Sequence, residues 1–273
     1  MRKTSNDHFL FLLGCKIMED EIVHVLANDR DVGKIVIIDN GEITDFVEKI
    51  KNVGIVPEIL PKETFWSRHE QNSYGTNQFN VVVLIQPKHL HSSPKKLKDT
   101  TYKTIKEQEA YVDSILLFYG SCGKAFNDLD NTFYGLDVNV HILGERKMSY
   151  TKQVTDCISA VVGGDEKYHS LLKQYPDALF FTPLWSSNWD ILFGDIEKNI
   201  KSDMKKKKFF KMMGVKTLIK IDTGINYETE FDLKINQFAA KFDFKVKEIS
   251  GTSAIIEQCY ANVKDKILIL EDK

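Results

Sequence analysis

Short apolar runs alternate with longer segments of helical periodicity, and this alternation limits the folds open to the chain. Residues 9–14 (FLFLLG) and 79–85 (FNVVVLI) are continuous apolar runs, typical of strands buried on both faces. Residues 17–27 and 227–242 instead space their apolar side chains three and four positions apart, as amphipathic helices do. Strands that alternate with helices predict an α/β fold, with mainly parallel sheets and helices on both faces.

The same patterns predict the remaining elements. We expect further strands at residues 34–39, 114–120, 137–143, 178–183, 215–222, 244–249 and 265–270. We expect helices at residues 62–73, 100–112, 156–175 (with a break at Gly163-Gly164), 188–213 (as two helices) and 253–262, and an exposed connection at 91–99. Glu19, Asp20 and Glu21 open the first helix, where acids favour the helix dipole. Residues 1–273 are expected to form a single α/β unit, and a division near 200–215 stays open.

Composition excludes several classes of partner. The chain has 273 residues and a formal net charge of −2, so neither nucleic acid nor an anionic membrane is expected to attract it. No stretch approaches the ~20 apolar residues of a membrane span. Residues 1–15 loosely imitate a signal peptide, but charged MEDE follows, and we expect a first strand there. Four cysteines in this length are no disulfide framework, which favours a reducing, cytoplasmic compartment.

Three of the four cysteines follow a predicted strand or open a predicted helix. Cys15 ends the first strand, Cys122 follows the strand at 114–120, and Cys157 opens the helix at 156–175. In an open α/β sheet these positions can share the edge where ligands bind. Cys259 lies among apolar residues of a helix, and we expect it to pack there.

The three thiols suggest a metal centre. They come from separate segments without a CxxC pair, and three thiolates leave one coordination position open, as in catalytic zinc or a 4Fe–4S cluster that binds substrate. Zinc and 4Fe–4S both remain candidate cofactors. The expected surroundings are Asp156 and Tyr119 as catalytic or supporting groups, with Gly120, Gly123 and Trp185 lining the cofactor pocket. Trp189 is expected to shape the pocket or to pack, and His141 could reach the site.

These residues resemble a prokaryotic family of unknown function that is common in methanogens and anaerobic bacteria. The matching motifs are LLGC (12–15), YGSCG (119–123), DCISAVVGGDEKY (156–168) and TPLW (182–185). The chain departs from the family pattern at Thr155, where the family often has histidine, and at Leu184 before Trp185.

That family is often encoded beside corrinoid-dependent methyltransferases. The resemblance implies an α/β fold, Cys15, Cys122, Asp156 and Cys157 as site residues, and a setting in one-carbon or cofactor metabolism. It implies no particular reaction, substrate or oligomeric state.

Three functions therefore stay open. The first is an enzyme or cofactor-handling protein with a zinc or iron–sulfur centre that acts on a small molecule. The second is a non-catalytic accessory protein that binds a corrinoid or a corrinoid methyltransferase. The third is a metal-free thiol enzyme with Cys157 as nucleophile, because a helix N-terminus favours a thiolate.

Overall fold

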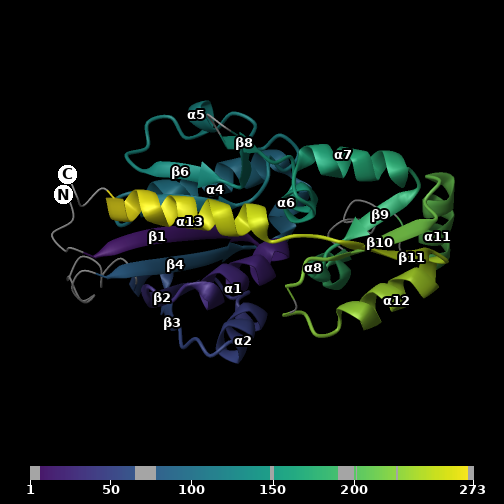
Figure 1. Cartoon of the computed structure of the whole chain (residues 1–273), viewed down its shortest axis with the longest axis horizontal. Helices are drawn as coiled ribbons and strands as arrows, with labels where there is room; N and C mark the ends of the chain where they lie inside the picture. The colour runs from purple at the N-terminus through teal and green to yellow at the C-terminus, as the bar shows by residue number, and fades with distance from the viewer. Residues whose placement is uncertain are drawn as a thin grey trace.

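The chain forms an α/β protein with two parallel sheets, which confirms the predicted fold class (Figure 1). The structure is a computed structural model and describes residues 7–64, 78–147, 151–189, 200, 202–225 and 227–269. The helix predicted at 62–73 and the first of two helices predicted within 188–213 lie largely outside these residues. The large sheet has the strand order β3-β2-β4-β1-β5-β6. Its strands are β1 (His8–Cys15), β2 (Val32–Asp39), β3 (Glu58–Pro61), β4 (Phe79–Gln86), β5 (Ser114–Phe118) and β6 (Asn139–Ile142).

Strand β1 lies at the centre of the large sheet, paired in parallel with β4 and β5. Its alternate side chains point to opposite faces, and both faces are covered. Leu10 and Leu12 pack with α1 (Glu19–Asn28), α2 (Thr44–Asn52) and α13 (Ala254–Ile269). Phe9, Phe11 and Leu13 pack on the other face, with α4 (Pro94–Gln108). Burial on both faces explains why the β1 sequence is apolar without alternation.

The helices after β1 and β4 leave on opposite faces of the sheet. The chain passes from β1 through η1 (Lys16–Met18) into α1 on the first face, and from β4 through η2 (Lys88–Ser92) into α4 on the second. Because β1 and β4 are neighbours, their divergent connections leave a crevice outside their carboxyl ends. This crevice is where the fold favours a ligand.

A small sheet forms the second lobe of the molecule. Its order is β11-β10-β9, all parallel, and its strands are β9 (Ala178–Phe181), β10 (Thr217–Asp222) and β11 (Lys245–Ser250). The small lobe also contains α7 (Asp165–Gln174), α8 (Pro183–Ser187), α11 (Asp203–Met212) and α12 (Phe231–Phe242). The sequence leaves open a domain boundary near residues 200–215. Helix α11 occupies most of this region, and in chain order it falls between β9 and β10, which belong to the same small sheet.

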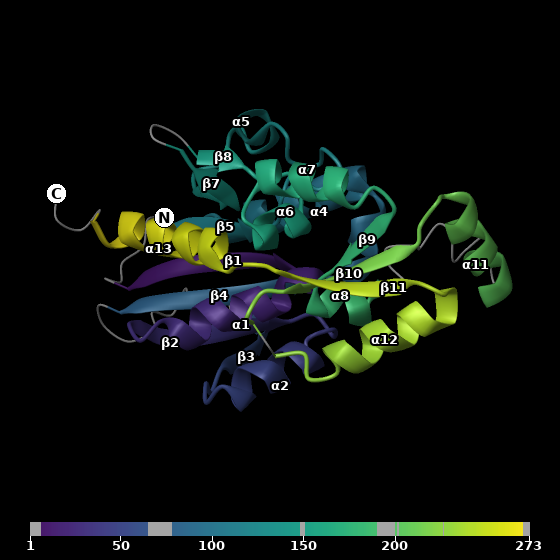
Figure 2. The ribbon, with the colours of Figure 1, turned by 45° about the vertical axis from the view of Figure 1, so that its right-hand side comes forward.

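The chain returns to the large lobe through α13, which packs beside β1 (Figures 1 and 2). The segment that leaves the large lobe and the segment that returns to it lie side by side, since Thr252 N, just before α13, donates to Val161 O at 2.7 Å. The strand predicted at 265–270 is wrong, because α13 continues to Ile269. Val263 and Ile267 are buried four residues apart, and neither glycine nor proline interrupts the helix between 253 and 267.

Two other helix boundaries differ from prediction. Helix α4 begins at Pro94, not near residue 100, and so absorbs much of the predicted connection at 91–99. Ser93 caps it by accepting from Lys96 N at 3.4 Å, and proline suits the first helical position. Helix α12 begins at Phe231, four residues later than the predicted start at 227. Helix α2 and the short strands β3, β7 (Gly144–Arg146) and β8 (Thr151–Gln153) were not predicted.

Candidate functional site

The three cysteines predicted as ligands lie around the carboxyl edge of the large sheet. Cys15 is the last residue of β1, Cys122 lies in the loop after β5, and Cys157 is the first residue of α6 (Cys157–Val162). Cys157 belongs to the apolar cluster on the α1 face, Cys122 packs against the cluster on the α4 face, and Cys15 contacts both. The thiols therefore surround the end of the central strand.

Two backbone hydrogen bonds join the loop after β5 to the segment before α6. Ser121 N donates to Val154 O at 2.9 Å, and Cys122 N donates to Thr155 O at 3.1 Å. Gly120 makes this approach possible, since a Cβ there would lie 2.5 Å from the Cα of Asp156. Only glycine permits two backbones to pack this closely. The contact brings the Cys122 and Cys157 segments together although they are distant in sequence.

The backbone at Cys122 is unusual. Cys122, Gly123 and Lys124 have φ angles of 43°, 63° and 73°, so three successive residues are left-handed. This conformation is uncommon for residues other than glycine, and it clusters at functional sites when the surroundings enforce it. The hydrogen bond from Cys122 N to Thr155 O is part of that enforcement.

The three thiols are coupled electrostatically. Burial raises the pKa of Cys15 to about 12, with Glu19 and Glu21 adding to the effect. Burial and the neighbouring Cys15 raise the pKa of Cys122, while burial, Asp156, Cys122 and Cys15 raise that of Cys157 well above its ordinary value. Because such coupling falls off with distance, the three thiols lie close enough to influence one another's pKa. Burial therefore disfavours the charged form of all three thiols, and at Cys157 it opposes the effect of the helix start.

As arranged, the thiols do not form a site for a single ion. Among the residues that the structure describes, no group of three or more His, Cys, Asp or Glu side chains is positioned to hold a metal ion. The donor chemistry nevertheless suits a soft metal, since three cysteine sulfurs come from three separate segments around the end of β1.

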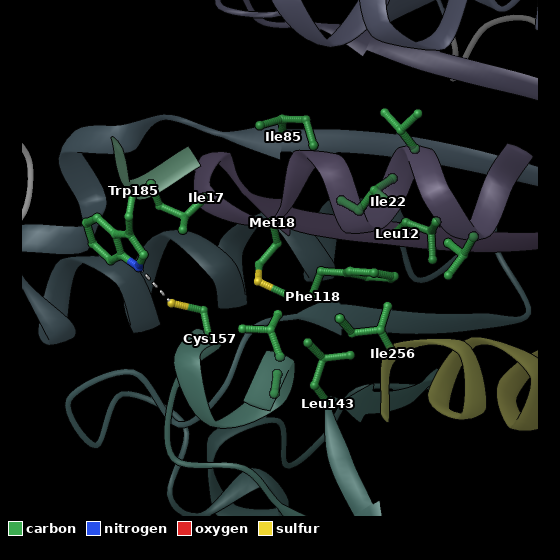
Figure 3. Packing of buried hydrophobic residues seen from close by; sticks show 14 of the residues in the cluster. Leu12, Ile17, Met18, Ile22, Ile85, Phe118, Leu143, Cys157, Trp185 and Ile256 are labelled. Carbon is green, nitrogen blue, oxygen red and sulfur yellow. Dashed lines mark hydrogen bonds between the residues drawn. The ribbon is translucent and has the colours of Figure 1, made fainter. Parts of the chain in front are cut away.

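Trp185 reaches this site from the small lobe. Its indole Nε1 donates to the Sγ of Cys157 at 3.3 Å, and the ring lies near Ile17 (Figure 3). Thr182 caps α8 by accepting from Trp185 N at 3.4 Å, which orients the helix that carries the indole. Figures 1 and 2 both place α8 at the carboxyl edge of the large sheet, so the site lies where the lobes meet.

The predicted catalytic residues, Asp156 and Tyr119, are both close to the thiols. Asp156 caps α6 by accepting from Ser159 N at 2.8 Å, and burial raises the pKa of its carboxyl group. Tyr119 donates its hydroxyl to Gln86 Oε1 at 2.7 Å beneath the site. Burial and the nearby Cys15 and Cys122 raise its pKa well above the ordinary range.

A buried acidic cluster behind Cys15 was not predicted. Glu19, Asp20 and Glu21 are only 0%, 1% and 2% exposed. Lys49 Nζ donates to Asp20 Oδ1 at 2.8 Å and lies 3.5 Å from Glu228 Oε2 of the small lobe. Successive helical residues point about 100° apart, so three consecutive acids cannot all face solvent on a covered helix. The run of three consecutive acids was therefore the sequence signal that at least one of them is buried.

The crevice at the carboxyl edge contains a cavity of about 310 Å³. Its lining is polar and comes from the connections after β1, β2 and β4 together with the end of α8: Lys16, Glu42, Thr44, Asp45, Lys88 and Asn188. Lys16 directly follows Cys15 in the chain, and the described lining itself includes none of the three thiols. Gly123 lies on the other side of the site, where a Cβ would come 3.0 Å from Cγ of Pro94.

Three other candidate residues from the sequence lie elsewhere. His141 lines a cavity of about 340 Å³ with Arg146 and Cys259, and the described lining includes none of the three thiols. Trp189 packs against Phe238, with ring centres 5.2 Å apart. The Cys259 thiol donates to Gly144 O at 3.2 Å inside the packing of α13, as expected for a core cysteine.

Comparison with known proteins supplies a family and no activity. A family model described as "Protein of unknown function (DUF1638)" matches residues 85–260. No curated protein matches the chain. In the part of the chain that the structure describes, no helix is both long and apolar enough to cross a membrane.

Proposed function

Because the chain belongs to the DUF1638 family of unknown function, which brings no reaction with it, we propose a function from the site. Cys15, Cys122 and Cys157 hold a 4Fe–4S cluster in a cytoplasmic enzyme or cofactor-handling protein. The observation that carries this proposal is the placement of the three cysteines around the carboxyl end of β1, where the Cys122 loop is hydrogen-bonded to the segment that leads into Cys157. The further assignment to one-carbon or methyl-transfer metabolism rests on the family resemblance alone.

The protonation of the thiols favours a metal centre over a metal-free nucleophile. A catalytic cysteine sits in an electropositive, partly exposed environment that lowers its pKa. Here burial and Asp156 raise the pKa of Cys157, and the residue is only 8% exposed. A bound cation would replace the three protons and offset the charge of the thiolates. The same surroundings that disfavour a free thiolate therefore suit a cysteine that binds a metal.

The spacing of the thiols favours a cluster over zinc. A single zinc ion draws every sulfur to about 2.3 Å from one point. The described thiols are coupled but are not positioned for a single ion. A 4Fe–4S cluster binds each thiolate to a different iron, so its ligands stand further apart.

A cluster held by three cysteines has one iron free to bind a substrate atom. We propose that a small polar molecule reaches it through the 310 Å³ cavity, whose lining carries the ammonium of Lys16 and the amide of Asn188. Asp156, beside Cys122 and Cys157, would then hold or accept a proton near the bound molecule. Trp185 donates to the Cys157 sulfur and would stabilise the negative charge of that sulfur as a metal-bound thiolate.

The test is metal analysis of single-cysteine variants after anaerobic purification and reconstitution. We expect about four iron and four sulfide per wild-type chain, and loss of most of both in C15S, C122S and C157S. The matched control is C259S, because Cys259 is also buried but bonds only to Gly144. Thermal unfolding of each apo-protein shows whether a variant has failed to fold.

The outcomes separate the alternatives. One zinc per chain, lost in the same three variants, would show that the site binds zinc and not a cluster. A chain without metal that copurifies with a corrinoid or a methyltransferase would favour the accessory protein. A metal-free chain with one fast-reacting thiol would favour the thiol enzyme. Equal metal loss in C259S would contradict the assignment of the three ligands.

A further inference from the structure

A buried glutamine ends the strand next to Cys15. Gln86 is the last residue of β4, and its Cα pairs with that of Cys15 at the end of β1. Gln86 is 3% exposed. In the sequence this residue only closes an apolar strand, and nothing there marks it as part of a site.

The hydrogen bonds of Gln86 fix the orientation of its amide. Its Oε1 accepts from the hydroxyl of Tyr119 at 2.7 Å and from Oγ1 of Thr101 at 3.2 Å. These bonds use both lone pairs of the carbonyl oxygen. The Nε2 group is buried, and in the described structure it has no hydrogen-bond partner. Both N–H donors of the Gln86 amide are therefore available to an acceptor that reaches this position.

The sheet places this amide next to Cys15. Leu84 and Leu13 both point to the α4 face, so Gln86 and Cys15, two residues later on each strand, share that face. Tyr119 follows β5 on the other side of β1 and belongs to the same face. The bond from Tyr119 to Gln86 therefore spans the end of β1 beneath Cys15.

We propose that Gln86 is a positioning residue whose Nε2 donates to the sulfur of Cys15 when that sulfur is a metal-bound thiolate. This inference rests on the proposed metal centre. The buried Nε2 of Gln86 stands on the strand neighbouring Cys15 and on the same face of the sheet, and a metal-bound thiolate is a strong hydrogen-bond acceptor for such a donor. Donors to ligand sulfurs strengthen the site and raise the reduction potential of a cluster.

The test compares Q86M with Q108M in reconstituted protein. Methionine keeps the length of glutamine and removes both donors. Gln108 is the matched control, because it is 0% exposed and its side-chain amide also has no hydrogen-bond partner within the described structure. It lies at the far end of α4, toward the amino edge of the sheet, since the chain leads from there into β5.

We expect Q86M to bind its metal about tenfold more weakly in chelator competition. If the metal is a cluster, its reduction potential should fall in Q86M. A tenfold change in the redox equilibrium corresponds to a fall of about 59 mV for one electron. Q108M should match wild type in both. If Q86M unfolds, Q86L and the melting temperatures of the apo-proteins decide whether the effect is structural.

Two results would overturn this inference in different ways. Normal metal content with unchanged affinity and potential in Q86M would remove the role of Gln86 and leave the metal centre intact. A wild-type chain that takes up no metal would remove both. An equal loss of affinity in Q108M would mean that core damage, and not the hydrogen bond to Cys15, is the cause.

Discussion

Replacing Gly120 by alanine tests the contact that builds the site. The new Cβ would lie 2.5 Å from the Cα and 2.6 Å from the N of Asp156, whereas carbon atoms pack at about 3.5–4.0 Å. The obstacle is backbone at the start of α6, where the Asp156 cap holds it, so no side chain can rotate away. The two segments must separate by roughly 1 Å to restore ordinary packing.

That separation breaks the two bonds between the segments. They are 2.9 Å from Ser121 N to Val154 O and 3.1 Å from Cys122 N to Thr155 O. Each contributes about 1 kcal/mol, and overpacking adds about 1–3 kcal/mol. We therefore expect G120A to lower the free energy of unfolding by roughly 3–5 kcal/mol and to reduce metal uptake by displacing Cys122 from Cys157.

The assay is urea unfolding of the apo-protein, followed by metal analysis after reconstitution. G135A is the control, because Gly135 has φ of 79° and a Cβ added there would meet no atom within 4 Å. It tests only backbone strain, worth about 1–2 kcal/mol. A loss below about 1 kcal/mol in G120A, with normal metal content, would refute the argument that this close approach positions the two thiols.

Two further predictions concern the surroundings of the thiols. W185F should lower the free energy of unfolding by about 1 kcal/mol, because it removes the N–H that donates to Cys157. This loss should vanish when W185F is made in a C157A background. A loss that persists there would show that ring packing, and not the hydrogen bond, is the cause. Burial raises the pKa of Glu19 to about 7 and that of Glu21 to about 8, above the value of about 4.3 in an unfolded chain. The folded protein therefore binds more protons between those values, and its unfolding free energy should fall as pH rises from about 5 to 8. Urea unfolding across this range should show a shallower slope in E21Q and an unchanged slope in E257Q, whereas a slope unaffected by E21Q would contradict the raised pKa.

Local patterns were sufficient for the fold class and for most strands. The apolar run at residues 9–14 correctly predicted β1, because such a run between polar flanks is typical of a strand covered on both faces. The run at 265–270 misled for the same reason, since a short apolar segment fits a strand and one face of a helix equally well. Its assignment depended on the large sheet against which α13 packs.

The glycine-flanked loop at Cys122 was visible as a special backbone, and the structure gives it left-handed angles. Gln86 was not visible, because a glutamine at the end of a strand ordinarily faces solvent. Its burial follows from α4 crossing that face and from Tyr119 reaching it across β1. The sequence pattern of a single strand does not show which side chains the other strands and helices will place against it.

The sequence by itself determined the parallel α/β architecture and the placement of three cysteines at strand ends or a helix start. Both follow from periodicity and from the rule that parallel strands share a carboxyl edge. Only the tertiary structure decided that the three cysteines pack around the end of β1, that Glu19, Asp20 and Glu21 are buried, and that Trp185 arrives from another lobe. Those features depend on contacts between residues far apart in the chain, and burial, which sets the charge of each group, is a property of the packed molecule.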